Sequence, residues 1–139
     1  MKDIKRIIIP VDNTEDSENA VKRGVFLAKL LGVDAKIITV NDTHQFISSV
    51  VIEEKLKKEA EAFLDKFKKI AEEYGMKIET QLVVGKPAEE IVKLAKEDDL
   101  IIMAHHDKTK GIDRVLDKSV SEDVIRNAPC SVFVVKSKE

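Results

Sequence analysis

Apolar residues follow two alternating patterns along the chain. Short, continuous runs rich in Ile and Val, with little polar alternation, are typical of parallel β-strands covered on both faces. Four runs have this form: residues 4–11, 35–40, 100–104 and 131–135. A fifth run, residues 77–84, alternates more between apolar and polar positions, which predicts a strand nearer the edge of the sheet.

Longer segments between these runs carry apolar residues at helical spacing. The first predicted helix extends from about residue 17 to residue 31 and stops at Gly32; a third begins at Pro87, and Pro129 ends the fourth. The second ends at Gly75 and has one apolar stripe: Leu56, Ala60, Phe63, Phe67, Ile70 and Tyr74. Because strands and helices alternate, we expect a three-layer α/β sandwich with an open, mostly parallel five-stranded sheet in one domain, residues 1–139.

The charge balance and the cysteine content narrow the function classes. With 24 Lys and Arg against 26 Asp and Glu, the net charge of −2 gives no general attraction to nucleic acid or to a membrane, so neither partner is expected. Cys130 is the single cysteine, which excludes an internal disulfide. The opening residues MKDIKRIII lack the apolar core of a signal peptide, and no stretch is apolar enough to span a membrane, so we expect a cytoplasmic protein.

Four segments in a fixed order carry a resemblance to a known family over nearly the whole chain. They are IIIPVDNTEDSENAV, ITVND, VVGKPAEEIVKLAKEDDLIIMA and KSVSEDVIRNAPCSVFVVK. In this order and spacing the chain resembles the universal stress protein family. The resemblance implies a flavodoxin-like, adenine-nucleotide α-hydrolase-like fold, usually a homodimer, and a role in survival under stress. It also implies that ATP is a ligand of some members and not of others.

The glycine-rich phosphate loop of the ATP-binding members is altered in this chain. In those members two glycines bracket a pair of residues and are followed nine residues later by Gly-Ser or Gly-Thr. Here Ala104, Asp107 and Lys118 stand at the glycine positions, only Ser119 is kept, and the spacing is ten. Glycine lets backbone N–H groups approach a phosphate closely, and Asp107 would repel one. We therefore expect no ATP cofactor bound in the family's usual manner.

An ATP-binding protein with a remodelled phosphate loop is the alternative. Asp12 and Val40 match residues that help to hold the adenosine moiety in ATP-binding relatives, and four cations near the altered loop could keep a positive field. Asp12 also has a structural interpretation, as a residue that turns the chain into the first helix, and both interpretations stay open. The cations are Lys108, Lys110, Arg114 and Lys118. The candidate site residues are Asp12, Val40, Ala104, Asp107, Lys118 and Ser119.

Other polar residues have simpler interpretations. The sequence SVSE predicts a capping box between Ser119 and Glu122, which explains the serine without a phosphate. His105, His106 and Asp107, together with His44, suggest a metal site. However, adjacent histidines in extended backbone point in opposite directions, so we expect no metal site.

The last strand and the absence of catalytic motifs complete the functional expectation. An apolar edge strand invites pairing with a second copy, so Val132, Phe133, Val134 and Val135 are the expected dimer interface. The third strand ends without the carboxylate that a phosphorylated receiver domain needs, and no hydrolase constellation follows the strand ends. We expect a non-catalytic homodimer, with slow ATP hydrolysis left open, whose partners are unknown proteins or a small ligand.

Overall fold

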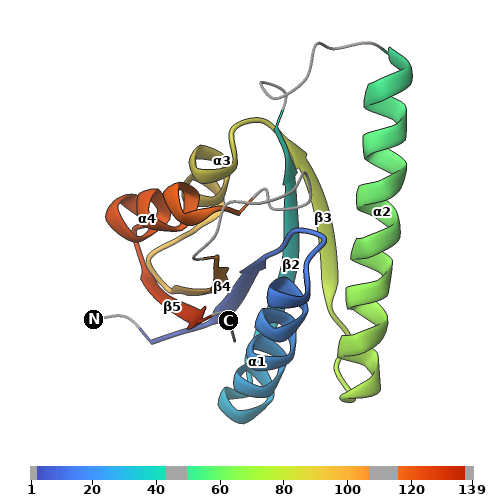
Figure 1. The fold of residues 1–139 in the computed structure, drawn as a ribbon. Coiled ribbons are helices and arrows are strands. Elements are labelled where there is room, and N and C mark those ends of the chain that lie inside the picture. The colour runs from blue at the N-terminus through green and yellow to red at the C-terminus, as the bar shows by residue number, and fades with distance from the viewer. Residues whose placement is uncertain (1–2, 43–49, 107–115, 137–139) are drawn as a thin grey trace.

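The computed structural model describes residues 3–42, 50–106 and 116–136, in which five strands alternate with four helices (Figure 1). The strands are β1 (Arg6–Pro10), β2 (Asp34–Asn41), β3 (Glu79–Val84), β4 (Asp99–His105) and β5 (Ser131–Lys136). The helices are α1 (Glu15–Leu31), α2 (Val50–Glu73), α3 (Pro87–Leu94) and α4 (Lys118–Asn127). All nine predicted elements are therefore present, with boundaries that differ by a few residues.

The strands form one parallel sheet in the order β3-β2-β1-β4-β5. The register pairs Pro10 with Ile38 on one side of β1 and Ile7 with Leu100 on the other, so the first strand of the chain lies in the centre. The predicted edge position of β3 is confirmed, and β5 forms the opposite edge. Since β1 and β4 are neighbours, the residues that follow their carboxyl ends are brought together.

Two apolar cores lie on opposite faces of the sheet. Ile7 and Ile9 of β1 pack under α1 and α2, whereas Ile8 between them packs under α3 and α4. This alternation follows from the period of two in a strand and explains why β1 is apolar at every position of its centre. Figure 1 shows the two helix pairs on either side of the sheet. The predicted three-layer sandwich is confirmed.

Four helix ends follow known capping chemistry, and three of them were predicted from Gly32, Gly75 and Pro87. The Thr14 side chain caps α1 by accepting from the Ser17 N–H, so the helix begins two residues before the predicted start. Gly32 ends α1 with φ of 70°, and Gly75 follows α2 with φ of 81°, a region that favours glycine. Pro87 is the first residue of α3, as predicted.

The predicted capping box at the start of α4 is wrong. Asp117 is the N-cap, and its carboxylate accepts from the Val120 N–H at 3.0 Å and from the Ser119 hydroxyl at 2.7 Å. Asp and Ser are comparable N-caps, and the Asp117 carboxylate also interacts favourably with the positive end of the helix dipole. Ser119 consequently lies inside the first turn instead of before it.

No helix in the described ranges 3–42, 50–106 and 116–136 is long and apolar enough to cross a membrane.

Candidate functional site

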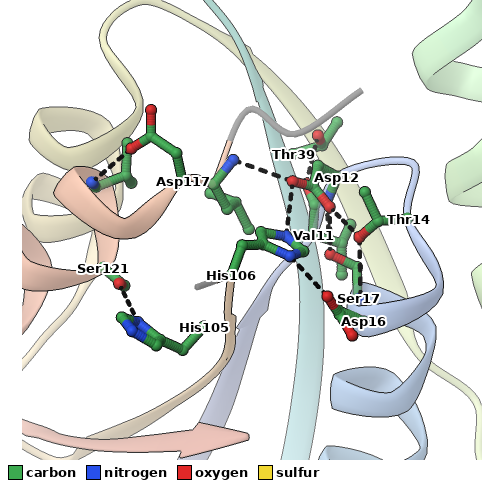
Figure 2. Close-up of polar contacts among 12 residues, drawn as sticks. Val11, Asp12, Thr14, Asp16, Ser17, Thr39, His105, His106, Asp117 and Ser121 are labelled. Atoms are coloured by element: carbon green, nitrogen blue, oxygen red, sulfur yellow. Dashed lines mark hydrogen bonds and ion pairs between the residues drawn. The ribbon is translucent and has the colours of Figure 1, made fainter. Parts of the chain in front are cut away.

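Polar side chains meet at the carboxyl ends of β1 and β4 (Figure 2). Asp12 lies two residues beyond β1, and His106 directly follows β4. In open parallel sheets ligands bind at this edge, which makes it the candidate site. Both side chains are fully buried, so their hydrogen-bond partners lie within the protein.

The Asp12 carboxylate accepts four hydrogen bonds. Oδ1 accepts from the Ser17 hydroxyl at 2.7 Å and the Thr14 hydroxyl at 2.5 Å. Oδ2 accepts from the Leu116 N–H at 3.0 Å and from Nε2 of His106 at 3.2 Å. A carboxylate offers about four acceptor positions. The hydrogen-bonding capacity of Asp12 is therefore used up inside the protein.

His106 lies between two carboxylates that come from different elements. Its Nε2 faces Asp12 at the end of β1, and its Nδ1 lies 2.8 Å from Oδ2 of Asp16 in the first turn of α1. An ionised carboxylate only accepts hydrogen bonds, so each ring nitrogen must carry a proton and donate it. An imidazolium meets this requirement, and with both carboxylates ionised Asp12, Asp16 and His106 would together carry a charge of −1.

Hydrogen bonding between His106 and Asp12 raises the pKa of the histidine and lowers the pKa of the carboxyl group. Burial acts to lower the pKa of His106, but the hydrogen bonds and charges of Asp12 and Asp16 outweigh it, so this pKa lies above its usual range. Burial also acts to raise the pKa of Asp12. There the hydrogen bonds from His106, the two hydroxyl groups and the Leu116 amide outweigh burial and hold the pKa below its usual range.

The turn from β1 into α1 fixes the orientation of Asp12. The Ser17 hydroxyl that donates to the carboxylate also accepts from the Asp12 N–H at 2.9 Å. Behind it, the buried Thr39 hydroxyl of β2 donates to the Val11 carbonyl at 2.7 Å. In the short segment DNTEDS, the hydroxyl groups of Thr14 and Ser17 thus donate to the Asp12 carboxylate. These hydrogen bonds give Asp12 a structural role in the turn into α1.

The adjacent histidine points to the opposite side of the sheet. Nδ1 of His105 lies 2.8 Å from the Ser121 hydroxyl of α4, and that hydroxyl in turn donates to the Lys118 carbonyl at 3.0 Å. Figure 2 shows the two rings directed toward different helices, as expected for neighbours in extended backbone. Ser121 is fully buried, so the pair is a packing contact of α4.

Five of the six predicted site residues lie in the described part of the chain, and Asp107 lies outside it. Asp12 joins the polar cluster, whereas Val40 and Ala104 are buried in the two different cores on opposite faces of the sheet. Lys118 and Ser119 are exposed in the first turn of α4. The cluster is completed by residues that the sequence analysis did not select for it: Thr14, Asp16, Ser17, His106 and Leu116.

Within the described ranges, no three His, Cys, Asp or Glu side chains form a group that could hold a metal ion. Of the metal ligands considered from the sequence, His44 and Asp107 lie outside those ranges. Both ring nitrogens of His106 are engaged by carboxylates, which leaves no lone pair for a metal.

Comparisons with known proteins agree with the fold. A universal stress protein of Methanocaldococcus jannaschii is 43% identical over 140 residues, covering 95% of this chain and 82% of that protein. A solved structure of a hypothetical protein, reported as a structure-based assignment of biochemical function, superposes with a TM-score of 0.80 at 36% identity and covers 97% of both chains. A universal stress protein solved in complex with cAMP has a TM-score of 0.74 at 24% identity, covering 96% of this chain and 98% of that one.

The match to a family model is also nearly complete. The model described as the universal stress protein family matches residues 3–136, which include every strand and helix of the structure. Together with the relative that is 43% identical, this match settles the family. The chain belongs to the universal stress protein family.

Proposed function

We propose that this universal stress protein is non-catalytic, acts through a protein partner or a small ligand, and does not bind ATP in the manner of the ATP-binding members. One observation carries the proposal. Asp12, at the position expected to help hold a nucleoside, is fully buried, and all four acceptor positions of its carboxylate are occupied by groups of the protein. A nucleoside would have to displace at least one of these contacts before it could bind Asp12.

The charges at this edge of the sheet also oppose a polyphosphate. The Asp12, Asp16 and His106 cluster is net negative, and repulsion between like charges is strong where the effective dielectric is low. The Asp117 carboxylate caps α4 and so takes the place at a helix N-terminus that a phosphate group would use. These contacts support a site that does not accept ATP.

Nucleotide binding with a remodelled loop remains the competing function. The fold accepts an adenine nucleotide in at least one relative, the universal stress protein solved with cAMP. That protein is only 24% identical, so its similarity to this chain concerns the fold and not the ligand. Lys118 is exposed at the start of α4 and could contact a phosphate. The two functions therefore make opposite predictions for the same titration.

The test is isothermal titration of ATP, with and without magnesium, into protein freed of bound ligand. We expect no saturable heat up to millimolar ATP, and the same result for cAMP. Saturable binding at one site per chain would overturn the proposal. In that case Lys118→Ala should weaken binding, while Lys93→Ala on α3 serves as a matched control with the same loss of charge.

The partner in the first instance is proposed to be a second copy of the chain. β5 is an edge strand of the sheet, and Phe133 in its centre is 42% exposed. An apolar edge strand with open backbone groups favours pairing, and two-fold symmetry would join Val132, Phe133, Val134 and Val135 of both copies.

The oligomeric state tests this second proposal directly. Light scattering after size-exclusion chromatography should give the mass of a dimer for the native chain and of a monomer for Phe133→Asp. Ile125→Asp is the matched control, because Ile125 is 52% exposed on α4 and is not in the proposed strand pairing. A native chain that is monomeric at high concentration would overturn the proposed dimer.

A further inference from the structure

The His106 ring connects four elements of the fold. It directly follows β4, and it contacts Asp12 beyond β1 and Asp16 in α1. The Asp12 oxygen that it contacts also accepts from the Leu116 N–H, two residues before the start of α4. One buried ring thus holds together segments that are 90 and 94 residues apart in the sequence.

We propose that His106 is a proton-dependent clasp, which as an imidazolium holds the ends of β1 and β4 against α1 and the entry to α4, and which opens when the ring loses a proton. The clasp would regulate the Asp12 site, which we proposed does not accept ATP. Its role in the function of the protein therefore rests on that proposed function. The opening itself can be measured without any nucleotide, so the two proposals can fail separately.

The two hydrogen bonds of the ring cannot both survive deprotonation. A neutral imidazole has one N–H donor and one lone pair, whereas both neighbours are carboxylate acceptors. The Nδ1 contact to Asp16 is the shorter at 2.8 Å and keeps its proton, so the lone pair of Nε2 then faces Oδ2 of Asp12. The released proton passes to solvent, and Asp12 loses its cation.

The charged groups facing the ring from the described elements are both carboxylates, Asp12 from the end of β1 and Asp16 from α1. On the side of α4, His105 is bonded to Ser121, and the Asp117 carboxylate is bonded to the Val120 N–H. The surrounding charges therefore favour the protonated ring, in agreement with the raised pKa of His106. The clasp is complete below the ordinary histidine pKa and is lost as the pH rises through the raised pKa in the folded protein.

The protonation state is tested by nuclear magnetic resonance of the ¹⁵N-labelled histidine rings across a pH titration. His106→Gln assigns the signal, and His105→Gln is the matched control, because His105 is adjacent but bonded to a serine. We expect the His106 ring to be doubly protonated below about pH 6.5 and to titrate above that value. Titration of the His106 ring below that value would overturn the proposal.

The opening is tested by hydrogen exchange of the Leu116 amide, expressed as a protection factor so that the intrinsic pH dependence is removed. In the native chain and in His105→Gln, protection should fall about tenfold for each pH unit above the transition. Protection that stays constant while His106 titrates would overturn the clasp. Asp16→Asn keeps the ring but removes one carboxylate, so it should move the transition to lower pH even if His106→Gln fails to fold.

Discussion

The same two strands, β1 and β4, are joined by an ion pair at each end, and the two pairs differ in chemistry. At the amino ends, Arg6 donates to both oxygens of Asp99 at 2.9 and 2.8 Å. At the carboxyl ends, His106 in its protonated form pairs with Asp12. The guanidinium keeps its charge at any pH that the fold survives, whereas the imidazolium holds its charge only while protonated.

The surroundings of the two pairs reinforce this difference. The Arg6 side chain is 27% exposed, so water can reach the cation if its partner is removed, but the His106 side chain is completely buried. Burial acts to raise the pKa of Asp99, and the Arg6 hydrogen bond outweighs it, so this pKa also lies below its usual range. The amino end of the strand pair is thus joined at every pH above the lowered pKa of Asp99, whereas the proposed clasp makes the carboxyl end depend on the charge of His106.

Asp12→Ala should have the largest effect on stability. It leaves Nε2 of the buried His106, two hydroxyl groups and the Leu116 N–H without their acceptor, and breaking a buried pair in this way costs about 3–5 kcal/mol. Urea denaturation of the variant measures the loss. The matched Asp12→Asn variant keeps the shape and one acceptor, and a loss below about 1 kcal/mol for Asp12→Ala would contradict the role of this carboxylate.

Asp99→Ala should cost less, about 2–3 kcal/mol by the same denaturation measurement. The variant removes both Arg6 hydrogen bonds and the acceptor of the Lys96 N–H at 2.8 Å. Because Arg6 is partly exposed, water can solvate its freed guanidinium. A loss larger than that of Asp12→Ala would reverse the comparison between the two ends.

The pH dependence of stability should separate the two ends further. The pKa of His106 is raised in the folded state, so its contribution is complete below about 6.5 and is lost as the pH rises through the folded value. The amount lost is about 1.4 kcal/mol for each pH unit between the unfolded and folded pKa values of the ring. The free energy of unfolding of the native chain should therefore fall above about pH 6.5. His106→Gln should remove this slope, and Asp99→Ala should retain it.

The cap of α4 should give the smallest effects at the carboxyl end. Asp117→Ala removes the acceptor of the Val120 N–H and should cost about 1 kcal/mol. Ser119→Ala removes only an exposed donor to Asp117 and should stay within about 0.5 kcal/mol. Thermal unfolding of the two variants shows whether Asp117 or Ser119 caps α4. A larger loss of stability for Ser119→Ala would support the capping box that the sequence suggested.

The fold was predictable because each element depends on local patterns. The run at residues 4–11 is apolar on both faces, and Gly32 and Pro87 mark a helix end and a helix start that the structure confirms. The predicted start of α4 is wrong because Asp117 and Ser119 are both good caps, and their order of preference depends on the path of the chain. Local sequence does not specify that path.

The polar cluster was not predictable in the same way, because it joins residues far apart in the chain. Asp12 is one of the predicted site residues, but nothing local links it to His106, 94 residues later. The strand order supplies the missing link, since two neighbouring parallel strands bring the residues after their carboxyl ends together. With that order assumed from the family resemblance, the alternation of His105 and His106 would have directed one ring toward Asp12.

The central position of β1 also affects how the chain is made on the ribosome. β1 is synthesised before the other four described strands, and its neighbour β4 follows much later, because Asp99 comes 93 residues after its partner Arg6. At translation rates of about 5–20 residues per second this wait lasts roughly 5–19 s. Until β4 has been synthesised, the edge of β1 that pairs with it lacks this partner, so the length of this interval is set by the speed of translation.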